Sequence, residues 1–379
     1  MAHYLYIHIP FCLKKCIYCD FYSVSDGADL INSYVSALGK EVELRKGHIN
    51  SLEAIYIGGG TPSILKVNDI AMTMDKLRST GTINANAEIN CEANPGTLTE
   101  EGIIGMIEAG INRISIGVQS LNDIELSLLG RMHNATEALA AFHAARKGGF
   151  RNISLDLIYG IPGQDINSWQ RTLEKVVSLR PEHISTYELT PEKTTILYEK
   201  LDKGCLKLPD EDVVAEMYYM AIDLLKGYGY AHYEISNFAL PGHECRHNLN
   251  YWNRGKYLGI GAGAHSFLDC RRIANVRDVK QYIHDVELGV LPIAEETLLT
   301  DRDEIEETLF LGLRKTEGFD IELIAGAITD KLKEALDELS HKGLLELSGS
   351  HLRLTREGLI ICNAIIVRLM ICIEQNRRA

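Results

Sequence analysis

The chain has 379 residues, enough for two domains or for one large domain with a smaller one attached. Its formal net charge of −13 argues against broad binding to nucleic acid, because phosphates attract basic surfaces. Nine cysteines without an N-terminal secretion signal predict a reducing compartment, and we expect a cytoplasmic protein. The most apolar stretch, residues 358–373, is interrupted by Asn363 and Arg368, which predicts a buried or partner-facing helix rather than a membrane span.

Short apolar segments alternate with segments of helical periodicity over the first two-thirds of the chain. The predicted strands are residues 4–9, 54–57, 87–91, 113–118, 153–158 and 183–188. The predicted helices between them include residues 31–44, 70–77, 100–109, 136–147 and 169–179. Repeated strand–helix units indicate an α/β fold with a parallel sheet and right-handed crossovers. About six units predict a partial (β/α)6 barrel of the TIM type rather than a complete eight-unit barrel.

Three cysteines, Cys12, Cys16 and Cys19, follow the first predicted strand in the spacing C-x-x-x-C-x-x-C. Three thiolates can hold three irons of a cubane cluster, and the fourth iron is then open to a small molecule, whereas ordinary electron-transfer clusters use four cysteines. Two other interpretations stay open. The cysteines could hold zinc together with His8, although structural zinc sites usually take four ligands from paired short spacings. They could also form a disulfide, which a reducing compartment disfavours.

Polar or glycine-rich segments lie at the ends of the other predicted strands. The second strand leads into Gly58-Gly59-Gly60-Thr61-Pro62, the third ends at Glu92, the fourth ends at Gln119, and the fifth contains Asp156. Because parallel sheets bind ligands at the carboxyl ends of their strands, we expect these residues to share one crevice with the three cysteines. Alone, the glycine run could be a tight loop and Asp156 a strand-end cap. Their conjunction favours a ligand site.

An open cluster iron can chelate an amino acid through its amine and carboxylate. S-adenosylmethionine (SAM) offers that pair beside a sulfonium, and one electron from a reduced cluster can cleave a C–S bond and generate a carbon radical. Glycines allow backbone groups to approach such a ligand closely, and carboxylates can accept hydrogen bonds from ribose hydroxyls or an ammonium. The crevice therefore predicts a site for a 4Fe–4S cluster and SAM.

The last third of the chain has a different pattern. A loop at Pro241-Gly242 precedes the motif HNLNYW and the glycine-rich residues 259–265, and from about Thr297 helical segments and a hairpin around Gly349 follow. We expect a barrel domain at residues 1–240, a connecting segment at 241–296, and a mainly helical, winged-helix-like domain at 297–379. The last domain is net acidic, whereas a DNA-reading wing needs a basic face, so we expect a lid or interaction domain.

The sequence resembles the radical SAM family, in the branch that contains oxygen-independent coproporphyrinogen III dehydrogenase and a haem chaperone. The resemblance covers nearly the whole chain and rests on nine segments in the family order: YIHIPFCLKKCIYCDF, IGGGTPS, EANPGT, ISIGVQS, LLGRMHN, LDLIYGIPGQ, YEISNFALPG, HNLNYW and YLGIGAGAHS. It implies that Cys12, Cys16 and Cys19 ligate a 4Fe–4S cluster. The SAM contacts that it implies are Tyr6 and Tyr18 beside the cluster and cofactor, Gly59, Gly60 and Thr61 at the methionine end, Glu92, Gln119, Arg131 and Asp156 around the ribose and carboxylate, and Ile260 near the adenine.

The two branch members belong to different function classes. The dehydrogenase carries a fourth cysteine two residues beyond the third, whereas Cys19 is followed here by Asp20 and Phe21. The Cys-Asp-Phe ending and the HNLNYW motif resemble the haem chaperone instead. We therefore expect a protein that binds haem as cargo and delivers it to recipient haem proteins. The dehydrogenase of porphyrin biosynthesis and another radical SAM enzyme stay open as alternatives, as do a homodimer and peripheral membrane contact.

His247 is the candidate axial ligand for haem. It lies next to Tyr251 and Trp252, whose rings could cover a porphyrin face, and Cys245 is two residues upstream. The alternative is that His247 and Trp252 only anchor a loop onto the barrel. We expect His265 to serve packing or a hydrogen bond near the cofactor.

Overall fold

The computed structural model describes residues 1–374. The chain divides into two compact units, the first made of residues 1–229 and 256–297, the second of residues 230–255 and the chain from Leu298 onward. Residues 241–296, expected as one connecting segment, are thus divided between the units: the HNLNYW motif belongs to the second and the glycine-rich residues 259–265 to the first.

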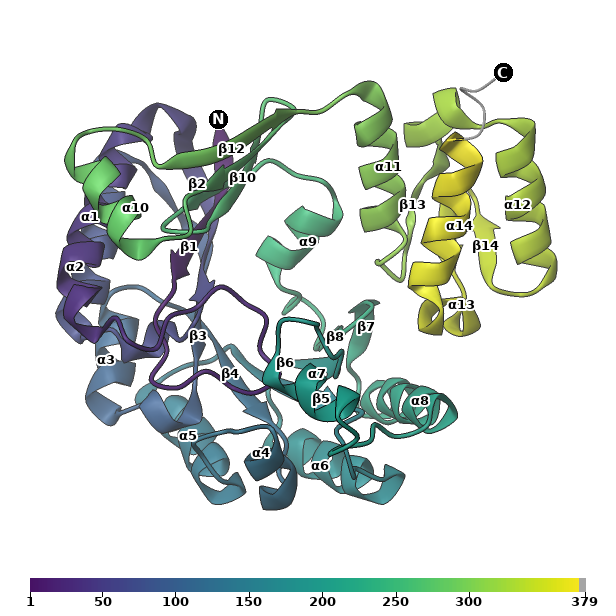
Figure 1. Ribbon diagram of the computed structural model, residues 1–379, viewed down its shortest axis with the longest axis horizontal. Coiled ribbons are helices and arrows are strands. Elements are labelled where there is room, and N and C mark those ends of the chain that lie inside the picture. The colour runs from purple at the N-terminus through teal and green to yellow at the C-terminus, as the bar shows by residue number, and fades with distance from the viewer. Residues whose placement is uncertain (375–379) are drawn as a thin grey trace. The chain divides into compact units, whose positions relative to one another are not determined.

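A parallel sheet forms the centre of the first unit, and Figure 1 labels its strands β1 to β6. The strands follow the order β6-β5-β4-β3-β2-β1-β9. Each strand in this order pairs in parallel with its neighbour. The strands are β1 Ala2–Ile9, β2 Ile49–Gly59, β3 Ile83–Ala93, β4 Arg113–Gln119, β5 Ile153–Tyr159, β6 His183–Glu188 and β9 Leu258–Ile260. The predicted α/β fold with a partial parallel barrel is confirmed. The short strand β9 was not predicted, and it extends the sheet beyond β1.

Helices cover the outer face of this curved sheet (Figure 1). The helices of the first unit are α1 Ile31–Leu44, α2 Val67–Thr80, α3 Glu100–Glu108, α4 Asp123–Leu128, α5 Ala135–Gly148, α6 Ile166–Leu179, α7 Ile196–Asp202, α8 Glu211–Gly227 and α10 Val279–Glu287, and of these α7 lies against the cysteine loop instead. Side-chain caps begin several of them, as in α5, where Asn134 and Glu137 form a capping box. The strands β10 His265–Leu268, β11 Arg271–Asn275 and β12 Ile293–Leu298 form a separate three-stranded sheet.

The parallel strands separate apolar and polar side chains onto opposite faces, as the two-residue period of a strand requires. Leu5, Ile7 and Ile9 of β1 are buried at 1% exposure or less, and so are Ile114 and Ile116 of β4. The alternate positions are polar, and the register places them in rows across the sheet: Tyr6 lies opposite Tyr56, Glu92 opposite Ser115, and Asp156 opposite Ser185. The apolar face is therefore available to the helices, while the other face gathers polar groups.

The second unit contains the antiparallel pair β7 Ala231–Glu234 and β8 Asn237–Ala239, the helices α9 Arg246–Trp252 and α11 Asp301–Gly312, and a small three-stranded sheet in the order β13-β15-β14. These strands are β13 Phe319–Asp320, β14 Leu345–Ser348 and β15 His351–Leu354. Helix α12 Asp330–His341 lies between β13 and β14 in the chain, and α13 Arg356–Ile360 and α14 Cys362–Glu374 follow β15. The hairpin and its helices confirm the winged-helix-like prediction. Among residues 1–374, no helix has both the length and the apolar character needed to cross a bilayer.

Candidate functional site

The three cysteines of the motif lie in a long loop that leaves the carboxyl end of β1. The loop is closed at its base, because Cys12 N donates to Val24 O at 2.9 Å and Val24 N donates to Pro10 O at 2.7 Å. Cys16 and Cys19 lie farther along, joined by a turn in which Cys19 N donates to Cys16 O at 3.3 Å. All three thiols are free and partly exposed, so the disulfide interpretation is wrong.

His8 is not placed to complete a zinc site with these thiols. Its Nε2 lies 3.0 Å from Tyr22 O, which can only accept, so Nε2 carries the proton and Nδ1 accepts from Tyr6 Oη at 2.9 Å. Burial lowers the pKa of His8 to about 4, which keeps the ring neutral. Within residues 1–374, no three His, Cys, Asp or Glu side chains are grouped to hold one metal ion. A cubane cluster makes no such demand, because each thiolate binds a different iron.

The glycine run after β2 is packed directly against the cysteine loop. Gly60 N donates to Ile9 O at 2.8 Å, and Thr61 N donates to Phe11 O at 2.8 Å. A Cβ at Gly60 would lie 2.6 Å from Phe11 O and 3.0 Å from Cys12 Sγ, so a larger residue cannot occupy this position without a shift. The run is therefore more than a tight turn: it brings backbone amides beside the first cysteine.

Arg131 connects β4 to the cysteine loop. Its Nη2 donates to Gly117 O at 2.7 Å, and its Nη1 lies 3.4 Å from Cys16 Sγ and 3.5 Å from Tyr18 Oη. Nε is buried, and no acceptor among the described residues lies within hydrogen-bonding distance of it. A buried donor without an acceptor is costly, so this atom favours an additional anionic or carbonyl ligand. Arg131 is not the solvated surface charge that a loop arginine usually is.

Glu92 and Asp156 are held by different donors on the polar face of the sheet. Glu92 accepts from Tyr56 Oη at 2.8 Å and from Gly59 N at 3.1 Å, and burial raises its pKa to about 7. Asp156 accepts from the hydroxyls of three serines on β4, β5 and β6, at 2.7 to 3.2 Å; these are Ser115, Ser154 and Ser185. Burial also raises the pKa of Asp156. Because its bonds run to side chains of three strands, Asp156 is not a strand-end cap.

The remaining residues expected at the SAM site lie in three different settings. Gln119 ends β4 at φ 68°, a strained conformation for a residue other than glycine, beside a register shift. Tyr6 stacks on Tyr56 at 6.2 Å, and burial raises the pKa of its hydroxyl. Ile260, in β9, is opposite Ile7 and has 0% exposure. All of the expected cluster and SAM residues therefore belong to the first unit.

Sequence reasoning missed the segment that supports the cysteine loop. Leu197 N, at the start of α7, donates to Ile17 O at 2.8 Å, and Ile17 N donates to Leu129 O at 3.3 Å. Ile17 and Tyr18 also pack against a cluster of buried residues that includes Leu129 and Leu197. The large side chains Ile17 and Tyr18 between two cysteines were a signal for this packing, because a loop exposed to water gains no stability from large apolar side chains.

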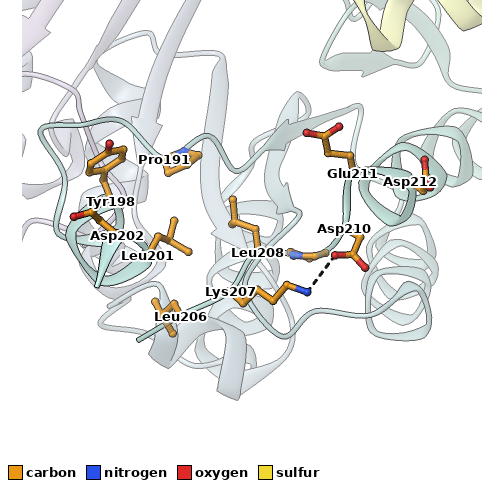
Figure 2. Close-up of a pocket in the computed structure, with 11 residues that line it drawn as sticks. Pro191, Tyr198, Leu201, Asp202, Leu206, Lys207, Leu208, Asp210, Glu211 and Asp212 are labelled. Carbon is orange, nitrogen blue, oxygen red and sulfur yellow. Dashed lines mark hydrogen bonds and ion pairs between the residues drawn. The ribbon is translucent and has the colours of Figure 1, made fainter. Parts of the chain in front are cut away.

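A separate cavity of about 720 Å³ lies between α7 and the start of α8 (Figure 2). Leu201, Leu206 and Leu208 line it, and a Lys207–Asp210 ion pair of 3.3 Å lies at its edge. None of the residues expected at the cluster or SAM site lines this cavity. It is not the predicted crevice, whose polar rows lie on the sheet.

His247 lies in α9 of the second unit, in a setting unlike that of the other candidates. Its side chain is 1% exposed, and its ring meets Tyr251 edge-on at a centroid distance of 4.5 Å. Burial lowers the pKa of His247 to about 3, so the imidazole is neutral at physiological pH. Nearby in the same unit, the Arg314 guanidinium lies 5.9 Å from the centre of the Trp252 ring.

Comparison with known proteins places this geometry in a family. Residues 6–176 match the radical SAM superfamily, and residues 299–361 match the HemN C-terminal domain. The haem chaperone HemW of Bacillus subtilis is 38% identical over 95% of this chain and 97% of its own length, and HemW of Escherichia coli is 35% identical over 96% of both. A bovine mitochondrial radical S-adenosyl methionine domain-containing protein is 32% identical over 97% of this chain and 87% of its own.

Among solved structures, coproporphyrinogen III oxidase (HemN) of E. coli, a radical SAM enzyme, superimposes with a TM-score of 0.82 at 25% identity. The superposition covers 98% of this chain and 89% of the oxidase, so it includes both compact units. The sequence relatives are closer in identity than this structural relative, and those from bacteria are haem chaperones by name. The chain therefore belongs to the radical SAM superfamily, in the HemW family within its HemN-like branch.

Proposed function

We propose that Cys12, Cys16 and Cys19 hold a 4Fe–4S cluster and that SAM binds beside it at the carboxyl edge of the sheet. Three observations support the fit: the thiols form no disulfide, a Cβ at Gly60 would collide with Phe11 O beside Cys12, and Arg131 Nε has no acceptor among the described residues. When bound, the cluster supplies one electron to the sulfonium of SAM.

The protein residues of this site would orient SAM. The Arg131 guanidinium is the donor suited to the SAM carboxylate, because its Nε is still open to an acceptor. The Glu92 and Asp156 carboxyls are acceptors suited to the ribose hydroxyls or the ammonium. With a pKa of about 7, the Glu92 side chain is partly protonated and partly ionised near neutral pH. Binding of a cationic sulfonium ligand nearby favours the carboxylate.

We propose further that the protein is a haem chaperone, which carries haem in the cytoplasm and delivers it to recipient haem proteins. The observation that carries this proposal is the identity of 38% with a HemW chaperone over 95% of the chain. The motif supports it, because Asp20 and Phe21 follow Cys19 and leave no fourth cysteine at that point. The alternative, oxidative decarboxylation of coproporphyrinogen III, is favoured by the similarity to the HemN structure.

One pair of assays separates the two functions. Protein reconstituted without oxygen receives coproporphyrinogen III, SAM and a reductant in one sample, and haem with an apo-haem protein in the other. We expect haem transfer in the second sample and no divinyl product in the first. Stoichiometric conversion of the porphyrinogen would overturn the chaperone proposal.

We propose His247 as the axial ligand for haem. The neutral state of its imidazole supports this role, because neutral imidazole is the form that binds iron. The 1% exposure means that α9 has to open for haem to reach the ring. A haem titration of His247→Ala tests the role against His243→Ala, a substitution in the loop before α9. Weaker binding and an altered Soret band in His247→Ala alone are expected, and an unchanged spectrum would remove His247 as ligand.

A further inference from the structure

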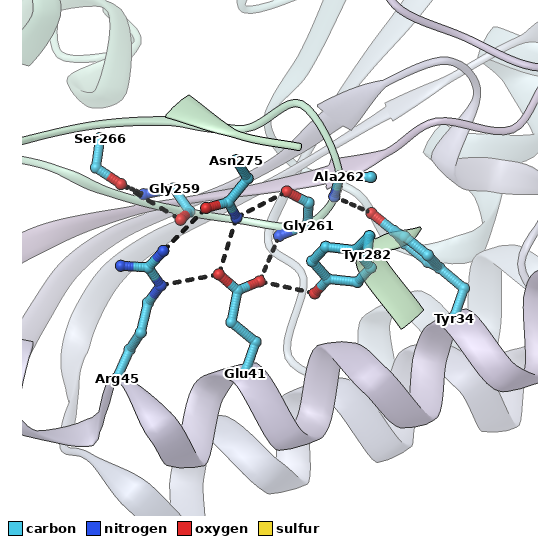
Figure 3. Close-up of polar contacts among 9 residues, drawn as sticks. All are labelled: Tyr34, Glu41, Arg45, Gly259, Gly261, Ala262, Ser266, Asn275 and Tyr282. Atoms are coloured by element: carbon cyan, nitrogen blue, oxygen red, sulfur yellow. Dashed lines mark hydrogen bonds and ion pairs between the residues drawn. The ribbon is translucent and has the colours of Figure 1, made fainter. Parts of the chain in front are cut away.

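The turn that follows β9 is held from behind by a buried carboxylate, Glu41 of α1 (Figure 3). Because β9 runs parallel to β1, with Ile260 opposite Ile7, the turn lies at the same sheet edge as the cysteine loop. We propose that Glu41 is a positioning residue, which fixes the Gly261-Ala262 turn so that the end of β9 can receive the adenosyl part of SAM. The inference rests on the proposed function, because it concerns the same cofactor.

Each carboxylate oxygen of Glu41 accepts two hydrogen bonds from protein donors. Oε1 accepts from Arg45 Nε at 2.8 Å and from Asn275 Nδ2 at 2.9 Å, while Oε2 accepts from Gly261 N at 2.8 Å and from Tyr282 Oη at 2.7 Å. Glu41 has 0% exposure, and Arg45 has 2%. A carboxylate has about four lone-pair positions, so these donors leave no room for a ligand. Glu41 therefore acts on SAM only through the turn.

Asn275 also hydrogen-bonds to the same turn. Its Nδ2 donates to Gly261 O at 2.9 Å as well as to Glu41, and its Oδ1 accepts from Arg45 Nη2 at 2.9 Å. The amide and the carbonyl of Gly261 are thus both bonded to side chains. Because Arg45 and Asn275 lie 230 residues apart in the chain, the network joins α1 to the strand β11.

Tyr34 joins the carboxyl ends of the neighbouring strands β1 and β9. Its hydroxyl donates to His8 O at 2.8 Å and accepts from Ala262 N at 2.8 Å. Gly261 has φ +102°, and a Cβ there would lie 2.6 Å from both His8 O and Tyr34 Oη. The turn is therefore pressed against the last residues of β1, just before the cysteine loop, with no space for adjustment.

Substitution of Glu41 by glutamine has a defined consequence. Glutamine has the same shape but only one acceptor oxygen, and its NH2 group must then face donors that were bonded to the other oxygen. In one orientation Gly261 N loses its acceptor, and in the other Arg45 and Asn275 lose theirs. Either orientation loosens the turn, whereas the cysteine loop keeps its own backbone bonds at Cys12 and Val24.

The test measures cluster content and SAM affinity separately. Wild type, Glu41→Gln and a control are reconstituted without oxygen, and iron, sulfide and SAM binding are measured by chemical analysis and equilibrium dialysis. We expect full iron content in Glu41→Gln, with the SAM dissociation constant raised about tenfold or more. The control is Glu182→Gln, at the amino ends of the strands, where the carboxylate likewise accepts from a backbone amide, Ile153 N at 2.9 Å, and from an arginine, Arg146. Its SAM affinity should stay within about twofold of wild type.

Tyr34→Phe is the second variant, since it removes only the bonds to His8 and Ala262 and keeps the ring. We expect its SAM dissociation constant to rise about threefold or more at full iron content. If Glu41→Gln folds and binds SAM as tightly as wild type, the inference is overturned. If Glu41→Gln does not fold, a wild-type SAM affinity in Tyr34→Phe overturns it. Neither result affects the proposed function. A wild-type protein that holds the cluster but does not bind SAM would overturn the proposed function, and the inference with it.

Discussion

The polar groups at the two ends of the parallel strands in the first unit differ in how they are bonded. At the amino ends, charges are paired: Glu182 bonds Arg146 and Ile153 N, and Glu88 lies 3.6 Å from Arg113. At the carboxyl ends the three thiols of the motif form no disulfide, Arg131 Nε has no acceptor among residues 1–374, and burial raises the pKa of Glu92 to about 7. The difference agrees with the proposal that the amino ends stabilise the fold, while the carboxyl ends bind a ligand.

The largest effect that this comparison predicts is loss of the cluster. Cys16→Ala removes one of three thiolates, and a cubane left with two protein ligands should not persist. We expect the charge-transfer absorbance and the bound iron to fall to background after anaerobic reconstitution. Cys205→Ala, which changes an exposed thiol in the loop after α7, is the matched control and should keep full iron. Full iron in Cys16→Ala would remove this loop as the cluster site.

Glu92→Gln should change how stability depends on pH. The folded pKa of about 7 lies above the ordinary 4.5, so the folded protein retains a proton that the unfolded chain loses. The contribution of Glu92 to stability is thus fully present below pH 4.5 and is lost as pH rises to 7, by about 3 kcal/mol. Relative to wild type, Glu92→Gln should therefore gain stability between pH 5 and 8 in urea titrations without SAM.

The control for that measurement is Glu43, a carboxylate whose pKa is lowered rather than raised. Glu43 is exposed and bonded to Lys46 and Lys76, which lower its pKa to about 2. Its contribution is present above pH 4.5 and is lost as pH falls toward 2. Glu43→Gln should therefore differ from wild type by a constant amount between pH 5 and 8. A constant difference for Glu92→Gln over this range would contradict the raised pKa.

At the amino ends, truncation should cost stability and spare ligand binding. Glu182→Ala leaves Ile153 N and Arg146 without their carboxylate, and we expect a loss of about 1–3 kcal/mol in the free energy of unfolding. Its SAM affinity should match wild type once the protein is folded. Chemical denaturation measures the loss of stability, and equilibrium dialysis measures the SAM affinity. A large loss of SAM affinity in Glu182→Ala would contradict the proposed difference between the two ends of the strands.

The smallest expected effect comes from backbone strain. Gln119 and Arg180 both have positive φ, 68° and 54°, the first at the carboxyl end of β4 and the second after α6. Glycine should relieve each by about 1 kcal/mol, seen as a higher Tm. Only Gln119→Gly should also weaken SAM binding, because only that substitution removes a side chain expected to contact SAM. Equal SAM affinity in both variants would mean that the Gln119 side chain has no part in binding.

Much of this protein could be predicted from local patterns. The alternation of apolar strands and helices predicted the parallel sheet, which is confirmed, and the spacing of Cys12, Cys16 and Cys19 predicted a cluster site, which stays a prediction. Register then explains why Glu92 and Asp156 share a face, since strand residues two apart point the same way. The hairpin around Gly349 was equally local, because a glycine between two short apolar runs is sufficient to indicate it, and the structure gives this glycine a positive φ.

Only the tertiary structure decided the groups that meet across long stretches of chain. β9 has three residues, too few for a periodic signal, yet it completes the sheet edge against β1. Glu41, in an ordinary amphipathic helix, finds Gly261 and Tyr282 more than 200 residues away. Strand and helix periods are local properties of the sequence, whereas the partners of a buried carboxylate depend on which surfaces pack together.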